Sequence, residues 1–201
     1  MPRLTVAHDF ICPWCWVAWE QAKKLAIEFP TLELDWVGFE LLPEGLDYTP
    51  SVPESNAPKK PRIPGRFELL LLAEGLTLPE RTHSFSRSRK ALEGVEYAKT
   101  EGKANAYLGG VYHAYWEEDR DIADREVLKD VAAKAGLDVA AFTRALEERT
   151  YRDTVVEYDD PAHAAGIWNV PTWEFPEEWV AEQPYSLVRE MAARFVEQET
   201  K

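Results

Sequence analysis

The sequence predicts an α/β fold in which a helical block separates two halves of one sheet. A β-α-β pattern fills roughly the first 40 residues, and a β-β-α pattern fills residues 171–199. Helical periodicity dominates the chain between them. With 201 residues and 45% hydrophobic side chains, the chain can bury one sizeable core and carry the helical block as an insertion.

The first half of the sheet is predicted from the hydrophobic pattern. Residues 3–8 and 32–41 alternate and are rich in strand-forming side chains. Between them the pattern is helical from Pro13 to about Glu28, and Pro30 ends it. One face of this helix carries Cys15, Trp19, Ala22 and Ala26. A strand therefore passes directly into a helix near residue 12.

The middle of the chain reads as a loop followed by helices. Residues 42–65 contain six prolines and are expected to form an exposed loop. The predicted helices span 66–76, 86–102, 104–119, 124–136, 138–150 and 151–166. Asp124 and Gly136 are expected to cap their helix, and Pro161 is expected to kink or break the last one.

The second half of the sheet is a predicted hairpin. Residues 171–175 and 179–183 are two short strands on either side of a Pro-Glu-Glu turn. An amphipathic helix over residues 185–199 follows them.

The two cysteines of the chain, Cys12 and Cys15, lie at the first strand-to-helix junction. A Cys-x-x-Cys pair near a β-α-β pattern indicates a thioredoxin-like redox motif. Pro13 suits the first helical position, so Cys12 becomes the N-cap, where the helix dipole favours a thiolate. We expect Cys12 to attack and the more enclosed Cys15 to resolve. Asp9 is expected to stabilise the turn, with a role as proton acceptor as the second interpretation.

Three other interpretations of the pair remain open but are less favoured. A zinc site needs four ligands, and the four histidines form no ligand-like pair: His8, His83, His113 and His163. A permanent disulfide across two residues would close almost no loop. Two inert core cysteines are the third possibility. The sequence gives no support for a metal site.

The segment DFICPWCWVA (residues 9–18) resembles the active-site segment of the DsbA-like thioredoxin-fold oxidoreductases, especially the FrnE-like branch with its Cys-Pro-Trp-Cys centre. Further segments are similar to that family in the same order. They are residues 39–45, residues 88–103 with 112–128, and residues 166–175. The resemblance covers most of the chain.

This resemblance implies a thioredoxin fold with a large α-helical insertion between the βαβ and ββα halves. The implied domains are residues 1–60 with 155–201 for the thioredoxin-like part and 62–154 for the inserted helical part. The cysteines would face the groove between the two parts.

The resemblance also implies the substrate-binding residues. Pro171 would follow a cis peptide bond beside the cysteines, and the backbone of Val170 would pair with an extended peptide. Further apolar contacts to the substrate are expected from residues around the thiols: Pro13, Trp14, Trp168 and Trp173. For each of the three tryptophans, packing in the core is the alternative. No cofactor is implied, and the reductant would be glutathione or a thioredoxin-type protein.

The favoured function is a thiol–disulfide oxidoreductase or isomerase that acts on disulfides of proteins, peptides or small molecules. The alternative is a glutathione-dependent isomerase or transferase, since 2-hydroxychromene-2-carboxylate isomerases and kappa-class glutathione transferases look similar in layout. Those enzymes typically carry Ser where Cys12 stands. A third hypothesis is a binding module that recognises its partner through the Pro-rich loop 42–65.

Charge and composition limit the classes of molecule that the protein is expected to bind. The formal net charge is −13, which argues against nucleic acid. The basic run 81–90 is interpreted as a solvated helix start, with an anion site as the alternative. We find no run of apolar residues long enough to span a membrane and no signal peptide, so we expect a cytoplasmic protein. In that compartment a thiol pair is more often catalytic or metal-binding than structural.

Overall fold

The computed structural model describes residues 1–43, 45–46, 63–80, 86–167 and 169–199. Most of the predicted loop 42–65, the first half of the basic run 81–90, and Trp168 lie outside them.

One four-stranded sheet has the order β2-β1-β3-β4. The central strand β1 (Arg3–His8) pairs in parallel with β2 (Glu33–Gly38) and antiparallel with β3 (Thr172–Glu174). β4 (Trp179–Ala181) pairs antiparallel with β3 and forms an edge of the sheet. The predicted α/β fold is therefore confirmed, with the two ends of the chain joined side by side through the pairing of β1 with β3.

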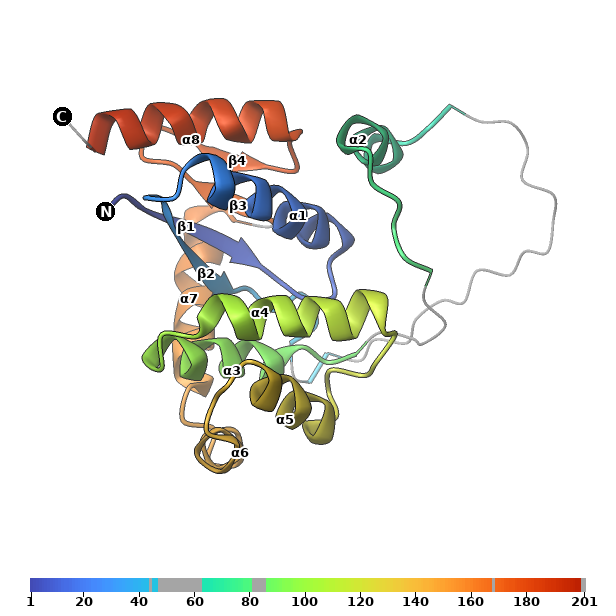
Figure 1. The fold of residues 1–201 in the computed structure, drawn as a ribbon, viewed down its shortest axis with the longest axis vertical. Helices are drawn as coiled ribbons and strands as arrows, with labels where there is room; N and C mark the ends of the chain where they lie inside the picture. Colours follow the sequence, from blue (N-terminus) through green and yellow to red (C-terminus); the bar gives the residue numbers. More distant parts are fainter. Residues whose placement is uncertain (44, 47–62, 81–85, 168, 200–201) are drawn as a thin grey trace.

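Helices α1 (Pro13–Glu28) and α8 (Tyr185–Glu199) contact each other and lie together on one side of the sheet (Figure 1). Their bounds agree with the predicted ones. The strand predicted over residues 32–41 is shorter, since it ends at Gly38. The strand predicted over 179–183 ends at Ala181, because Glu182 has a positive φ of 53° that turns the chain away from the sheet.

The helical block consists of α3 (Arg89–Thr100), α4 (Ala104–Tyr112), α5 (Arg125–Lys134), α6 (Val139–Glu147) and α7 (Arg152–Ala165). It lies beside the edge strand β2 (Figure 1), which both α3 and α7 contact.

Local signals explain most of the helix ends in this block. The Asp124 carboxylate accepts a hydrogen bond from the backbone N–H of Glu126 at 2.9 Å, which confirms it as the N-cap of α5. The segment predicted as one helix over 104–119 is instead α4 followed by the π-helical turn η1 (His113–Glu117).

Of the two outcomes predicted at Pro161, a kink or a break, the structure excludes the break, since α7 continues through Pro161 to Ala165. A proline removes one backbone hydrogen bond from a helix. Val155 and Ala162 are buried on either side of it, so contacts with the rest of the molecule keep both halves in one helix.

Helix α2 (Arg66–Glu74) stands apart from the helical block (Figure 1). The Glu74 carboxylate accepts hydrogen bonds from Lys24 Nζ at 2.9 Å, from Gln21 Nε2 at 3.2 Å and from the backbone N–H of Tyr185. The predicted domain division assigns α2 to the inserted part, but these contacts attach it to α1 and to the start of α8.

No helix among the described residues combines the length and the apolar character needed to cross a bilayer.

Candidate active site

The loop between β1 and α1 places the cysteine pair at the start of α1. The backbone N–H of Cys12 donates to the Asp9 carbonyl at 3.2 Å, which closes the turn. Cys12 is the N-cap, in extended backbone geometry, and Pro13 follows it at the first helical position. The predicted N-cap position is therefore found, because the sequence carries both helix-start signals at this point.

The two thiols are not bonded to each other and differ in accessibility. Cys12 is 5% exposed, whereas Cys15 is 0% exposed. The backbone N–H of Asp9 lies 3.5 Å from Cys15 Sγ. Burial, together with the neighbouring Cys12 thiol, raises the pKa of Cys15 well above its usual value. Cys15 is thus a protonated thiol that needs a base before it can act as a nucleophile.

The segment before β3 lies directly against Cys12. The Val170–Pro171 peptide bond is cis, and the Cys12 thiol donates to the Val170 carbonyl at 3.3 Å. The sulfur makes no capping hydrogen bond to the backbone of the first turn of α1. It points instead at the backbone that was predicted to bind an extended peptide, so residues 12 and 170 meet although 158 positions separate them.

The predicted apolar surface beside the thiols is only partly present. Trp14 is half-buried and lies beside Phe67 of α2, with ring centroids 4.8 Å apart, while the Arg66 guanidinium lies 5.5 Å from its ring. Trp173 does not fit the predicted contact with substrate, because it is 1% exposed and packs edge-on against Trp36 in the core. Its position on β3 turns it toward the interior of the fold.

Asp9 is fully buried behind the pair. Its carboxylate accepts hydrogen bonds from the backbone N–H of Leu41 at 2.8 Å and of Ile11 at 3.3 Å. Burial raises the pKa of Asp9, although these two donors and the Ser88 side chain act in the opposite direction. The carboxylate bridges the cysteine loop to the segment after β2, which fits the turn-stabilising role, and its raised proton affinity also suits a proton acceptor.

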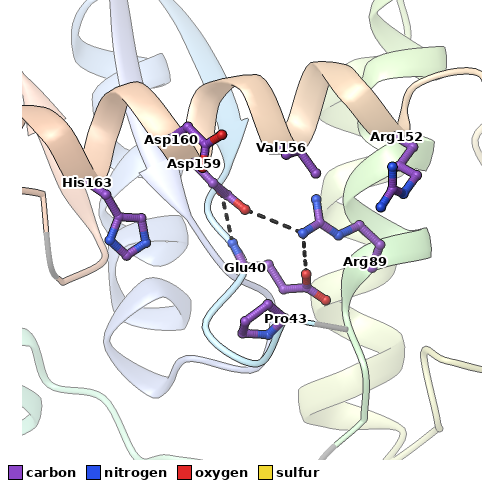
Figure 2. A pocket seen from close by; sticks show the side chains of 8 residues that line it. All are labelled: Glu40, Pro43, Arg89, Arg152, Val156, Asp159, Asp160 and His163. Carbon is purple, nitrogen blue, oxygen red and sulfur yellow. Dashed lines mark hydrogen bonds and ion pairs between the residues drawn. The ribbon is translucent and has the colours of Figure 1, made fainter. Parts of the chain in front are cut away.

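A cluster of charged side chains that sequence reasoning missed lies next to Asp9. The Arg89 Nη2 group pairs with Glu40 and lies 3.4 Å from Asp159 Oδ2 (Figure 2). Burial raises the pKa of Glu40 to about 7 and that of Asp159 to about 6. These side chains line a cavity of about 310 Å³. No local signal marks the cluster, because its members come from three distant segments.

The described part of the basic run 81–90 corrects its interpretation as a solvated helix start. Arg89 is 6% exposed and pairs with carboxylates. The Arg87 guanidinium donates to the carbonyls of Leu42 and Pro43 at 2.9 Å and of Leu46 at 2.7 Å. Both arginines therefore bind groups of the protein itself.

Comparisons with known proteins extend over nearly the whole chain. Residues 3–180 match the model of a family described as DSBA-like thioredoxin domain. The chain is 33% identical over 177 residues to the uncharacterized protein YwbO of Bacillus subtilis, and the match covers 85% of both chains.

Three solved structures share the fold. A probable DsbA oxidoreductase from Streptomyces coelicolor is 24% identical with a TM-score of 0.77, covering 97% of this chain and 90% of its own. A 2-hydroxychromene-2-carboxylate isomerase is 20% identical with a TM-score of 0.71 and 98% coverage of both chains. The cytosolic disulfide reductase DsbM from Pseudomonas aeruginosa, solved with glutathione, is 19% identical with a TM-score of 0.66, covering 96% and 99%.

Proposed function

The chain belongs to the DSBA-like thioredoxin domain family, and from this premise we propose that it is a thiol–disulfide oxidoreductase or isomerase that works through Cys12 and Cys15. The observation that carries the proposal is the unequal placement of the two thiols. Cys12 begins a helix, is the more exposed of the two and faces the cis-Pro171 segment, whereas Cys15 lies fully buried one turn later.

The proposed cycle uses both thiols in turn. The Cys12 thiolate attacks one sulfur of a substrate disulfide, and the other substrate sulfur leaves as a thiol. Cys15, after losing its proton, attacks the Cys12 sulfur. The second substrate thiol is released, and a Cys12–Cys15 disulfide remains. An external thiol reductant then restores the dithiol.

The backbone of Val170 supports the proposed binding of substrate. In the dithiol form, the carbonyl of Val170 accepts a hydrogen bond from the Cys12 thiol. A thiolate has no proton to donate, so the same carbonyl becomes available when Cys12 ionises. It can then pair with the main chain of a substrate segment, which gives affinity without demanding a particular sequence.

We place the protein in the FrnE-like branch and in the cytoplasm, with glutathione or a thioredoxin-type protein as reductant. The Cys-Pro-Trp-Cys centre supports the branch. The shared fold with a cytosolic disulfide reductase solved with glutathione supports the compartment and the reductant.

Reduction of insulin by dithiothreitol tests the proposal. The protein should accelerate the precipitation of insulin, and Cys12→Ser should abolish the acceleration. An unchanged rate with Cys12→Ser would contradict the proposal and would favour a binding module that does not need its thiols.

The second candidate is a glutathione-dependent isomerase or transferase, suggested by the shared fold with the chromene-carboxylate isomerase. The two candidates differ in their need for Cys15. A glutathione transfer reaction needs only one residue at the helix start, so Cys15→Ser would keep full activity with glutathione and an electrophile. The proposed redox cycle loses turnover in that variant.

A further inference from the structure

Glu40 is a buried carboxyl whose surroundings do not fully neutralise it. Its residue is 4% exposed, and its ion-pair partner Arg89 is 6% exposed. Among the described residues, Glu40 Oε1 and Arg89 Nη1 make no hydrogen bond. Glu40 and Arg89 both line the cavity in Figure 2, together with the exposed residues Arg152, Asp160 and His163. The cavity therefore reaches the surface beside Glu40, whose own side chain is 0% exposed.

Asp9 links Glu40 to the cysteine pair. The Asp9 carboxylate accepts a hydrogen bond from the backbone N–H of Leu41, the residue after Glu40. On the other side, the backbone N–H of Asp9 lies against Cys15 Sγ. The charge on Asp9 contributes to the raised pKa of Glu40 and to that of Cys15. The interaction between two charges is mutual and weakens with distance. A negative charge on Glu40 therefore raises the pKa of Asp9, and it acts on Cys15 through Asp9.

The groups that face Glu40 come from three elements. Asp9 approaches from the β1–α1 loop and Arg89 from the start of α3. The remaining groups are on α7, where Asp159 accepts the Glu40 backbone N–H at 3.3 Å and the other charged side chains line the same cavity: Arg152, Asp160 and His163. Two carboxyls, Glu40 and Asp159, thus share one buried guanidinium, so ionisation of both leaves a net negative charge near Asp9.

We propose that Glu40, held by Arg89 in the wall of the cavity, is a positioning residue that sets the proton affinity of Asp9 during the Cys15 step. This inference rests on the proposed function. In the step, the Cys15 thiol gives its proton to the Asp9 carboxylate. The Cys15 thiolate then forms a bond to the Cys12 sulfur, the bond from Cys12 to substrate sulfur breaks, and the substrate leaves as a thiolate that takes a proton from water. Ionised Glu40 makes Asp9 the stronger base.

The two steps can be followed separately with 5,5′-dithiobis(2-nitrobenzoate). Attack by Cys12 releases one thionitrobenzoate, and attack by Cys15 releases the second. In the unchanged protein, the rate of the second release should rise with a midpoint near the Glu40 pKa of about 7. Glu40→Gln should remove this rise and slow the second release about tenfold above pH ~8, since one unit of Asp9 pKa corresponds to a factor of ten. The first release should keep its rate.

The matched control is Glu93→Gln. Glu93 is a buried carboxylate on the same helix as Arg89, but it pairs with Arg149 at 2.8 Å. This variant should keep the pH dependence of the second release. If Glu40→Gln fails to fold, Asp159→Asn should shift the same midpoint to lower pH, because it removes one of the charges that raise the pKa of Glu40.

Two results would overturn the inference while leaving the redox cycle in place. One is a second release that keeps its wild-type pH dependence in Glu40→Gln, and the other is an equal slowing of both releases. Loss of the proposed function would look different, because the unchanged protein would then release no thionitrobenzoate that depends on Cys12.

Discussion

At the scale of single residues, the site separates two chemically identical thiols by their surroundings. Cys12 lies at the N-terminus of α1, beside the partial positive charge of the helix dipole, and its thiol donates a hydrogen bond to the Val170 carbonyl. Cys15 is fully buried and needs a base. His8 is a poor base for this purpose, since burial lowers its pKa to about 3. The buried carboxyl of Asp9, with a raised pKa, has the higher proton affinity of the two.

Replacement of Cys15 by Ser should stop the cycle at the mixed disulfide. The Cys12 attack remains, but no second thiol is present to release the substrate. Mass spectrometry of a non-reduced digest should therefore find substrate attached to Cys12 in Cys15→Ser and no stable adduct in Cys12→Ser. An adduct on Cys15 in the Cys12→Ser variant would reverse the assigned roles.

At the scale of elements, α2 forms one wall beside the cysteine pair. Its first residues, Arg66 and Phe67, contact Trp14, and its last residue, Glu74, accepts three hydrogen bonds from α1 and the start of α8. The Glu74 side chain is 3% exposed, so the helix is attached at both ends. The position of Trp14 therefore depends on a helix that lies more than 50 residues away in sequence.

Glu74→Ala should loosen α2 without unfolding the rest of the molecule. Loss of hydrogen bonds to a charged group costs about 1.5–3 kcal/mol, which corresponds to roughly tenfold to hundredfold faster amide exchange. Hydrogen–deuterium exchange followed by mass spectrometry should show this increase in peptides of α2 and little change in α5. The control is Glu190→Ala, an exposed i,i+4 pair with Arg194 on α8, which should leave α2 unchanged.

At the scale of the whole molecule, aromatic side chains join the helical block to the sheet-bearing part. Trp19 of α1 stacks on Tyr112 of α4 at 5.8 Å, and His8 of β1 lies 3.0 Å from the Tyr112 hydroxyl. Gly109 allows this contact, since a Cβ at that position would lie 2.9 Å from the Trp19 ring. The two parts are thereby held together next to the cysteine loop.

Gly109→Ala should destabilise the protein by about 1–3 kcal/mol, because the added methyl group overpacks the contact between α1 and α4. Urea unfolding measures this change. In a Trp19→Phe background the smaller ring should relieve the contact, so that Gly109→Ala costs less there. Equal costs in both backgrounds would show that the two helices adjust freely.

The sequence by itself determined the order of most helices and strands and the position of the thiols. Hydrophobic periodicity and the helix-start signals at Cys12, Pro13 and Asp124 are local, so they can be recognised in the sequence without knowledge of the tertiary structure. The family resemblance supplied the thioredoxin fold with its helical insertion, which the family match and the shared structures confirm, and it supplied the cis-Pro171 bond found in the structure. The predicted domain boundaries and residue roles stay predictions.

Only the tertiary structure decided which side chains face the thiols. The burial of Trp173, the attachment of α2 and the continuation of α7 through Pro161 depend on neighbours that are distant in sequence. The same holds for the cluster of Glu40, Arg89 and Asp159, whose members lie on three elements brought together by the sheet order and the helical block. Proton affinity depends on burial and on nearby charge, and neither is defined until the chain has folded.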